Sequence, residues 1–274
     1  MRISRAETTA NYLLLGVFAV LTLVPLAGVL LSAVTPEGEL RVGFDLPSRL
    51  SLANFSAAWQ AGNFSRYMVN SVLVVAGVVV LTALLSTLAG FAFATMRFPG
   101  RSVLFYVLLL GLMLPVESFI IPLYYDLRGW GLTDTYWSLL LPQTAQSLAF
   151  GTFWMRNYFR SFPASVVEAA RVDGATDRAL LWRILVPAAR PALMTMSLLI
   201  AMWTWNEFLL PLVMISGEPW RTAPLGLAFF QGQHATQTQL LAAAATIVAL
   251  PIVLAYLFLQ RRFIAGMLSG AVKG

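Results

Sequence analysis

Long apolar stretches alternate with short polar segments along the whole chain. Six of these stretches can cross a bilayer, because the roughly 30 Å hydrocarbon core takes about 20 residues of helix. They occupy residues 12–34, 70–95, 102–125, 135–155, 192–216 and 239–260. The pattern predicts an all-α, polytopic integral membrane protein with six transmembrane helices.

The first stretch follows Arg2 and Arg5, as the apolar region of a signal peptide would. Its apolar run is longer than the roughly 7–15 residues of such a region, so we expect it to remain as an anchor. Composition agrees with a membrane protein, since 11% of the residues are charged against about 25% in soluble domains.

Residue counts also exclude several chemistries. The chain has no cysteine, which excludes disulfides, thiolate metal sites and cysteine nucleophiles. Its only lysine is Lys273, so a G-x-x-x-x-G-K-[ST] phosphate loop cannot precede it. The single histidine, His234, has no companion metal ligands at helical spacing and is interpreted as an ordinary loop residue. We therefore expect no cofactor, no metal and no ATP-hydrolysing site in this chain.

The basic residues divide unequally between the two sides of the predicted bundle. If the N-terminus is cytoplasmic, 13 of the 18 Lys and Arg residues lie on the cytoplasmic side and 5 on the outer side. This asymmetry matches the positive-inside rule and predicts that both termini are cytoplasmic. The net charge of +6 then reflects topology, and it gives no support to nucleic-acid binding.

The longest predicted cytoplasmic segment, residues 157–191, begins with the pattern of a short helix. Ser161 is a candidate N-cap, Pro163 falls in the first turn, and Gly174 can take the left-handed conformation that ends a helix. The helix carries apolar residues on one face: Val166, Val167 and Ala170.

A second short helix follows in the same segment. Thr176 and Asp177 offer an N-cap and a first-turn carboxylate, and Pro187 and Pro191 are expected to end the helix. Its apolar stripe consists of Leu180, Leu181, Ile184 and Leu185. Both stripes need a partner, which is either the membrane surface and the inner ends of the bundle or another protein.

The identities of these residues resemble the EAA loop of permease subunits from binding-protein-dependent ABC importers. The matching run is Glu168-Ala169-Ala170, Asp173-Gly174-Ala175 and Ile184-x-x-Pro187-x-x-x-Pro191. Further matches to the carbohydrate-uptake branch are Asn70-Ser71, Phe98-Pro99-Gly100, Trp205-Asn206-Glu207 and the stretch 260–274. The resemblance covers about residues 66–274, and Trp182 departs from the phenylalanine common in that family.

This resemblance implies a multi-subunit importer in the cytoplasmic membrane. The chain would form a heterodimer with a second permease, two ATP-binding subunits would bind ATP and Mg, and an extracytoplasmic solute-binding protein would deliver a sugar or related solute. The coupling-helix loop between spans four and five would contact the ATPase. The residues implied in that contact are Glu168, Ala169, Ala170, Asp173, Gly174 and Ala175.

The expected organisation has three parts. Residues 1–65 hold the first span and an outer loop, residues 66–262 form the permease domain, and residues 263–274 form a cytoplasmic tail.

Two carboxylates lie within predicted spans, where ionisable groups are functional candidates. Glu117 and Glu207 each follow the start of a span by 15 residues, or about 22 Å of helix rise, which predicts similar depths. Each also precedes a proline in a similar run of residues, Glu117-Ser-Phe-Ile-Ile-Pro122-Leu and Glu207-Phe-Leu-Leu-Pro211-Leu. They either lock the bundle through polar partners or line an outer vestibule, and the candidate translocation path comprises Asn70, Glu117, Gln143, Gln146, Asn206 and Glu207.

Two questions stay open at this point, and a third interpretation is disfavoured. Small residues at Ser86, Gly90 and Ala94 form one helix face that serves either internal packing or the interface with the second permease. A stand-alone proton-coupled secondary transporter would use Glu117 and Glu207, but it leaves the helix-pair loop unexplained. A membrane-embedded enzyme finds no support in the residue types present.

Overall fold

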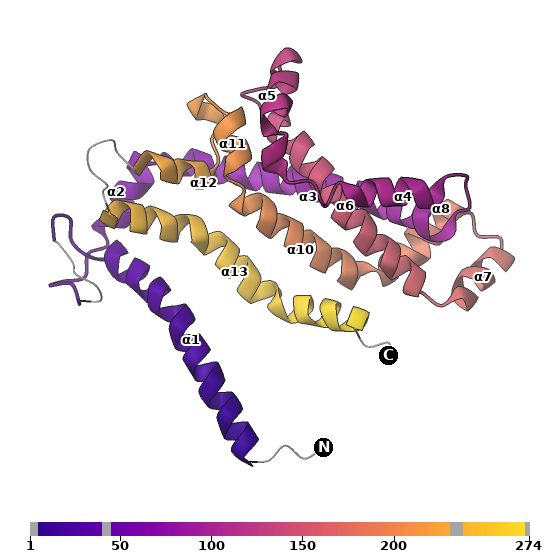
Figure 1. Ribbon diagram of the computed structural model, residues 1–274, viewed down its shortest axis with the longest axis horizontal. Helices are drawn as coiled ribbons and strands as arrows, with labels where there is room; N and C mark the ends of the chain where they lie inside the picture. The colour runs from indigo at the N-terminus through magenta and orange to yellow at the C-terminus, as the bar shows by residue number, and fades with distance from the viewer. Residues whose placement is uncertain (1–4, 40–44, 231–237, 272–274) are drawn as a thin grey trace. The chain divides into compact units, whose positions relative to one another are not determined.

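The computed structural model describes residues 5–39, 45–230 and 238–271, and these ranges form helices and turns without a β-strand (Figure 1). The α-helices are α1 (Arg5–Ala33), α2 (Ala53–Ala61), α3 (Phe64–Thr95), α4 (Arg101–Leu110), α5 (Ile120–Gly129), α6 (Trp137–Ser161), α7 (Ala164–Val172), α8 (Asp177–Ala179), α9 (Val186–Ala188), α10 (Arg190–Asn206), α11 (Leu209–Met214), α12 (Ala223–Gly226) and α13 (Thr238–Ala271). A π-helical segment, Leu180–Leu185, joins α8 to α9. The all-α fold class is confirmed.

Three of the described helices are long and apolar enough to cross a membrane. They are Glu7–Ala33 of α1, Phe64–Thr95 and Thr238–Phe258 of α13. A fourth candidate is the pair Asp177–Ala188 and Arg190–Asn206, whose two parts bend by 75°. The chain is therefore a multi-pass membrane protein, while the count of six spans stays a prediction.

The first of two compact units joins residues 1–66 to 226–251. At the end of α1, the Asn54 side-chain amide donates hydrogen bonds to the carbonyls of Ala33 and Thr35, at 2.9 and 2.7 Å. Large apolar side chains from Tyr12 to Leu30 are 40–72% exposed, which suits a helix that faces lipid.

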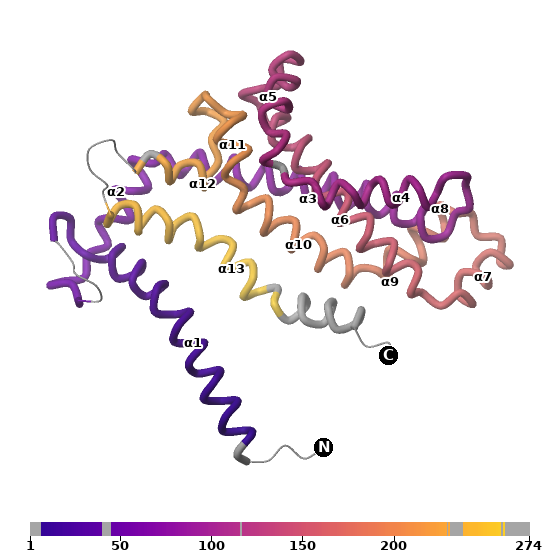
Figure 2. Tube along the Cα trace, viewed as in Figure 1, coloured from indigo at the N-terminus to yellow at the C-terminus, as the bar shows by residue number. Residues whose placement is uncertain are grey.

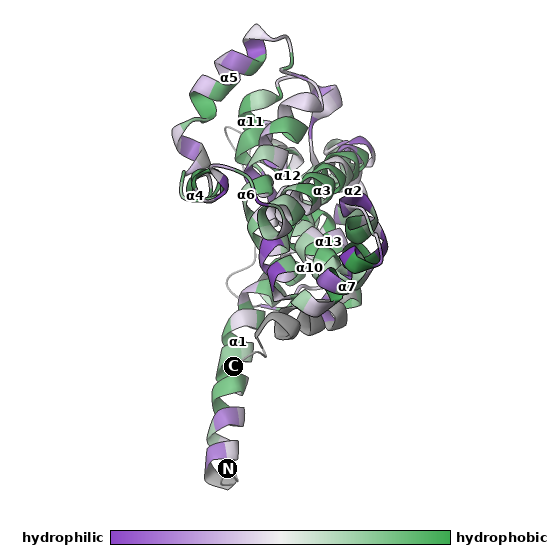
Figure 3. Cartoon of the chain, turned by 90° about the vertical axis from the view of Figure 1, so that its right-hand side faces the viewer, coloured by the Kyte–Doolittle hydropathy of each residue, from purple (hydrophilic) through white to green (hydrophobic). Residues whose placement is uncertain are grey.

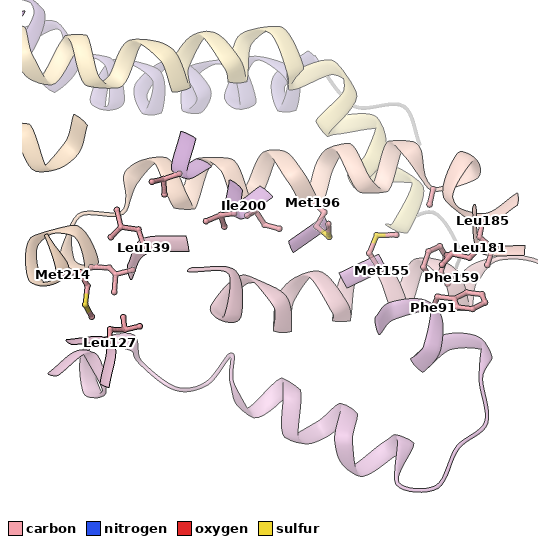
Figure 4. Close-up of a cluster of buried hydrophobic side chains, with 14 of the residues drawn as sticks. Phe91, Leu127, Leu139, Met155, Phe159, Leu181, Leu185, Met196, Ile200 and Met214 are labelled. Carbon is pink, nitrogen blue, oxygen red and sulfur yellow. The ribbon is translucent and has the colours of Figure 1, made fainter. Parts of the chain in front are cut away.

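The second unit joins residues 67–225 to 252–274 and holds a continuous apolar core. Figure 4 shows a row of buried side chains that runs from Phe91 and Leu185 at one end to Leu127 and Met214 at the other. Met196 of α10 lies near the middle of this row. The candidate functional residues described below are arranged around this core.

The predicted continuous span over residues 102–125 is wrong, because α4 ends at Leu110 and α5 begins at Ile120. Gly111 and Pro115 explain the break. A proline lacks the N–H that would bond four residues back, and its ring clashes with that carbonyl, which here belongs to the low-propensity Gly111. The chain turns instead through Leu112 N–H to Leu109 O, at 2.9 Å.

The predicted continuous span over residues 192–216 is also wrong, because α10 ends at Asn206 and α11 starts at Leu209. Pro211 stands four residues after Glu207, so its ring disfavours a helical continuation at the Glu207 carbonyl. Glu207 accordingly takes an extended conformation with ψ 123°. The equal-rise estimate for Glu117 and Glu207 therefore loses its basis, since neither residue lies inside a continuous helix.

The two breaks share a local design. The half-helices α5 and α11 begin Ile-Ile-Pro-Leu and Leu-Leu-Pro-Leu, each preceded by a phenylalanine. Leu123 N–H bonds to Phe119 O and Leu212 N–H bonds to Phe208 O, both at 3.0 Å. Figure 3 shows a difference between them, because α11 is largely hydrophobic while α5 mixes hydrophobic and hydrophilic residues.

The small-residue face of α3 packs internally against α6. A Cβ added to Gly90 would lie 2.7 Å from Met155 Cβ and 2.9 Å from Arg156 N. Ser86 and Gly90 are buried, and Ala94 packs against the apolar core. Of the two readings that the sequence left open for this face, internal packing is the one found.

Candidate functional site

The joint between α7 and α8 is built by a glycine in the left-handed region. Gly174 has φ +80°, as predicted. Its N–H bonds to Arg171 O at 3.0 Å, and the Ala175 N–H bonds to Ala170 O at 2.9 Å. These two hydrogen bonds form a Schellman motif, which satisfies the last carbonyls of α7 and fixes the direction of the following chain.

The second short helix starts as the sequence predicts. Thr176 is its N-cap, and its Oγ1 accepts a hydrogen bond from the Ala179 N–H at 3.3 Å. Asp177 lies in the first turn and forms an ion pair with Arg171 of α7, with 3.6 Å between N and O. Both side chains are about half exposed, so this ion pair contributes little to the stability of the fold. It does link α7 to the start of α8.

The start of α7 differs from the prediction. Ser161 is the last residue of α6, where its Oγ donates to Tyr158 O, and it is not an N-cap. Pro163 is the N-cap residue with ψ 124°, so it precedes the helix and does not lie within its first turn. A proline disfavours helical geometry in the residue before it, which accounts for the extended Phe162 between α6 and α7.

The end of the second helix also differs from the prediction. Pro187 lies inside α9, and the chain bends by 75° between Asp177–Ala188 and Arg190–Asn206. Figure 2 labels the helices on the two sides of this bend, α9 and α10. Pro191 falls in the first turn of α10, where its missing N–H is tolerated. Two side chains of α6 brace the bend: Tyr158 Oη donates to Ala188 O at 2.7 Å, and Trp154 Nε1 donates to Ala192 O at 3.0 Å.

The apolar stripes of the helix pair contact the core of their own chain. Ala170 and the three leucines Leu180, Leu181 and Leu185 are buried in the core cluster. Phe91 of α3 and Phe159 of α6 belong to the same cluster, with ring centroids 6.4 Å apart. The apolar stripes of the helix pair therefore share one close-packed core with α3 and α6.

The opposite face of the pair is exposed. Glu168, Ala169, Asp173 and Gly174 are all exposed, and the side chain of Val172 is 88% exposed. Of the other predicted coupling residues, Ala175 is half-buried and Ala170 is buried, so the small side chain of Ala170 permits close approach to the chain's own core. Trp182 adds an exposed aromatic ring to this face.

A cavity of about 220 Å³ with both polar and apolar lining lies beside the break after α10. It brings together three of the predicted path residues, Gln143 and Gln146 of α6 and Glu207. The remaining lining residues are Gly111, Leu112, Leu114, Ser147, Phe150, Trp203 and Thr204. Gln143, Gln146, Ser147 and Phe150 fall at helical spacing on one face of α6, a signal from which the last two could have been found.

The cavity combines hydrogen-bonding groups with aromatic surface. Gln143 is 5% exposed, and its Oε1 has no hydrogen-bond partner among the described residues. Phe150 and Trp203 meet edge to face with centroids 4.9 Å apart. One Glu207 oxygen accepts a hydrogen bond from the Leu210 N–H at 3.0 Å and so caps α11. An unpaired buried amide oxygen is costly, which makes Gln143 a candidate for binding a ligand hydroxyl.

The other three predicted path residues lie outside this lining. Asn70 is buried, and its amide donates to the carbonyls of Pro219 and Arg221 while Tyr136 Oη donates to its Oδ1, so it tethers the segment after α11. Asn206 is exposed and donates to Met202 O within α10. Glu117 is exposed in the break before α5. His234 lies outside the described residues.

Comparison with known proteins gives consistent matches. A family model described as "Binding-protein-dependent transport system inner membrane component" matches residues 86–269. The chain is 34% identical over 268 residues to the diacetylchitobiose uptake system permease protein NgcG of Streptomyces coelicolor, a match that covers 97% of this chain and 88% of the relative. It is also 34% identical over 261 residues to the arabinooligosaccharides transport system permease protein AraQ of Halalkalibacterium halodurans, covering 93% of each.

The fold matches a solved structure as well. The chain has a TM-score of 0.81 against a chain of a bacterial ABC transporter involved in the import of the acidic polysaccharide alginate. The two chains are 24% identical, and the match covers 96% of this chain and 99% of the other.

Proposed function

The chain belongs to the binding-protein-dependent transport system inner membrane components and is a permease subunit of an ABC importer, and from this premise we propose that its cargo is a di- or oligosaccharide. With a second permease it forms the translocation pathway, two ATP-binding subunits drive it, and an extracytoplasmic binding protein delivers the sugar. The observation that carries the proposal is the similarity of the chain, over nearly its full length, to permeases named for diacetylchitobiose and arabinooligosaccharides.

The residues present support the roles that we assign to this chain and to the ATP-binding subunits. The helix pair supplies the contact with the ATPase through Glu168, Ala169, Asp173 and Gly174, which are exposed, and through Ala175. Glu168 has a carboxylate suited to charge-assisted hydrogen bonds with basic groups. ATP and Mg bind to the partner subunits, and this chain contributes no catalytic group.

We place six spans in the membrane, built from α1, α3, α4 with α5, α6, α10 with α11, and α13. A helix of 10 residues such as α4 rises about 15 Å, so it covers about half of a roughly 30 Å hydrocarbon core before the chain breaks. Residues 1–65, 66–262 and 263–274 then serve as the first span with its outer loop, the permease domain and the cytoplasmic tail.

The orientation is tested by single-cysteine labelling, for which a chain without cysteine is suited. Val172→Cys is expected to react with a membrane-impermeant maleimide only in inside-out vesicles, because the 88% exposed side chain lies on the cytoplasmic helix pair. Leu46→Cys, 80% exposed in the outer loop, is the matched control and is expected to react in right-side-out vesicles. Labelling of Val172→Cys from outside would overturn the coupling role of the loop.

The cavity beside Glu207 is the part of the pathway that we assign to this subunit. Amide, hydroxyl and carboxylate groups suit sugar hydroxyls, and the Trp203 and Phe150 rings suit the apolar faces of pyranose rings. In this assignment Gln143 and Gln146 bind hydroxyls as the sugar passes. Glu207 sets the shape of the break by capping α11.

Gln143→Leu is expected to reduce sugar uptake about tenfold without lowering the thermal unfolding midpoint. One hydrogen bond to a substrate hydroxyl accounts for about a tenfold effect, whereas removing a buried amide oxygen that has no partner among the described residues relieves a desolvation penalty. Uptake of labelled di- and oligosaccharides by proteoliposomes that contain the whole importer measures the effect. Thr144→Val is the matched control, because Thr144 Oγ1 is also buried and unpartnered on α6 but lies outside the cavity lining.

Two results would contradict the assignment. Equal uptake by the Gln143→Leu and Thr144→Val importers would remove the cavity from the pathway. Failure of every saccharide to stimulate ATP hydrolysis in the presence of the binding protein would remove the sugar cargo itself.

A further inference from the structure

Four arginines gather where α3, α4 and α6 meet at the end of the molecule that we place in the cytoplasm. Arg97, Arg101, Arg156 and Arg160 line one cavity of about 690 Å³. No aspartate or glutamate is among the residues that line it. Within the described ranges, none of the four guanidinium groups forms an ion pair.

Local geometry holds two of these arginines in place. Gly100, with φ +76°, turns the chain from α3 into α4, so that Arg97 and Arg101 stand on either side of the turn. Arg101 donates to Met96 O at 2.8 Å. Arg156 donates to Phe93 O at 3.4 Å, and its guanidinium carbon lies 3.8 Å from the centre of the Phe105 ring. These contacts hold Arg101 and Arg156, whereas Arg97 and Arg160 are exposed.

The cluster concentrates like charge. Arg101 and Arg160 set two further positive charges near the Arg156 guanidinium, and these like charges repel one another. Arginine stays protonated at neutral pH, so the repulsion is retained. An anion in the cavity would relieve it, and phosphate oxygens suit the planar donor fork of arginine.

The cavity opens beside an apolar face. Val103 and Tyr106 line it, and both side chains are 66% exposed. Leu104, Val107 and Leu110 continue the exposed apolar surface along α4, at 53%, 58% and 57%. A ligand that fits both parts has a phosphate at one end and hydrocarbon chains at the other.

We propose that this cavity, called here the arginine cavity, binds the headgroup of an anionic phospholipid of the inner leaflet, with the acyl chains along α4. Basic pockets between helices on the cytoplasmic side of membrane proteins are suited to such headgroups. The lipid would tie α4 to α3 and α6, which form the core next to the helix pair. This inference does not depend on which substrate the importer carries.

The test uses the purified whole importer in detergent, titrated with phosphatidylglycerol, and native mass spectrometry counts the bound lipids. The double variant Arg97→Gln/Arg160→Gln is expected to bind phosphatidylglycerol about 30-fold more weakly, since each arginine near an anionic lipid contributes about a fivefold factor. These two arginines are chosen because they are exposed, so the fold should be retained. Arg97→Gln alone, with about a fivefold loss, serves if the double variant does not assemble.

The controls distinguish binding of the lipid from binding of a free anion and from a general effect of removing positive charge. Arg66→Gln/Arg128→Gln removes two exposed arginines elsewhere and is expected to leave phosphatidylglycerol binding unchanged. Phosphatidylcholine is expected to bind weakly, and millimolar inorganic phosphate is expected not to displace phosphatidylglycerol. The proposal is overturned if both double variants lose affinity equally, if phosphatidylcholine binds as tightly, or if phosphate alone displaces the lipid.

Discussion

Replacing Gly174 by proline is expected to reduce sugar uptake and binding-protein-stimulated ATP hydrolysis about 100-fold. Proline fixes φ near −65°, whereas Gly174 requires +80°, and proline also removes the N–H that bonds to Arg171 O. A penalty of about 3 kcal/mol corresponds to about a 100-fold smaller population of the intact joint. Because the stripes of the pair pack on Phe91 and Phe159, a distorted joint would no longer transmit displacement between the ATPase and the bundle.

Two further variants separate the effect of the backbone conformation at position 174 from the effect of the exposed charge at position 168. A Cβ at position 174 would have no atom within 4 Å, so Gly174→Asn tests the backbone alone and is expected to retain most activity, because asparagine tolerates the left-handed region. Glu168→Lys changes an exposed charge and is expected to weaken pull-down of the ATPase subunit without changing the thermal midpoint. Full uptake by both Gly174→Pro and Glu168→Lys would make the loop a passive connector.

The helix-pair loop was largely predictable because its conformation is set by local residues. Gly174, Thr176 and Asp177 act within one or two turns of their own position, through a positive φ, a capping hydroxyl and a first-turn charge. Ser161 failed as an N-cap because α6 continues through it until Pro163 disfavours helix at Phe162. Capping preference alone could not show where the preceding helix ends.

The broken spans were not predicted, although the residues responsible were visible. Hydropathy measures transfer to lipid and takes no account of the carbonyl four residues before a proline, so Pro115 and Pro211 left the apolar pattern intact. The sequence contains similar runs of residues after Glu117 and Glu207, but only the helix starts at Ile120 and Leu209 show what the two runs have in common.

The polar residues in and near the cavity show that sequence patterns also do not predict long-range contacts. Polar residues in spans are candidates by residue type alone, and composition cannot separate Gln143, whose Oε1 has no partner among the described residues, from Asn70, which tethers a loop. That difference depends on contacts between residues about 150 positions apart in the chain. Single-sequence patterns carry no information about such contacts.

Gly90→Val is expected to lower the folded yield of the permease about 100-fold. Its Cβ would lie 2.7 Å from Met155 Cβ, 2.9 Å from Arg156 N and 3.1 Å from Met155 C, so α3 and α6 would have to separate. Overpacking against backbone that cannot move costs about 3 kcal/mol, or about a 100-fold change in the folded-to-unfolded ratio. Size-exclusion profiles and the thermal midpoint of the isolated subunit in detergent measure the effect.

Gly77→Val is the matched control on the same helix. A Cβ at Gly77 would meet the terminal methyl Cδ2 of Leu140 at 2.5 Å, and that flexible group can move to another rotamer at a small cost. We therefore expect a near-normal yield for Gly77→Val. If the Gly90 face instead served the second permease, Gly90→Val would leave the isolated subunit as stable as the wild type and would prevent only its assembly with the partner, which would contradict the internal α3–α6 contact.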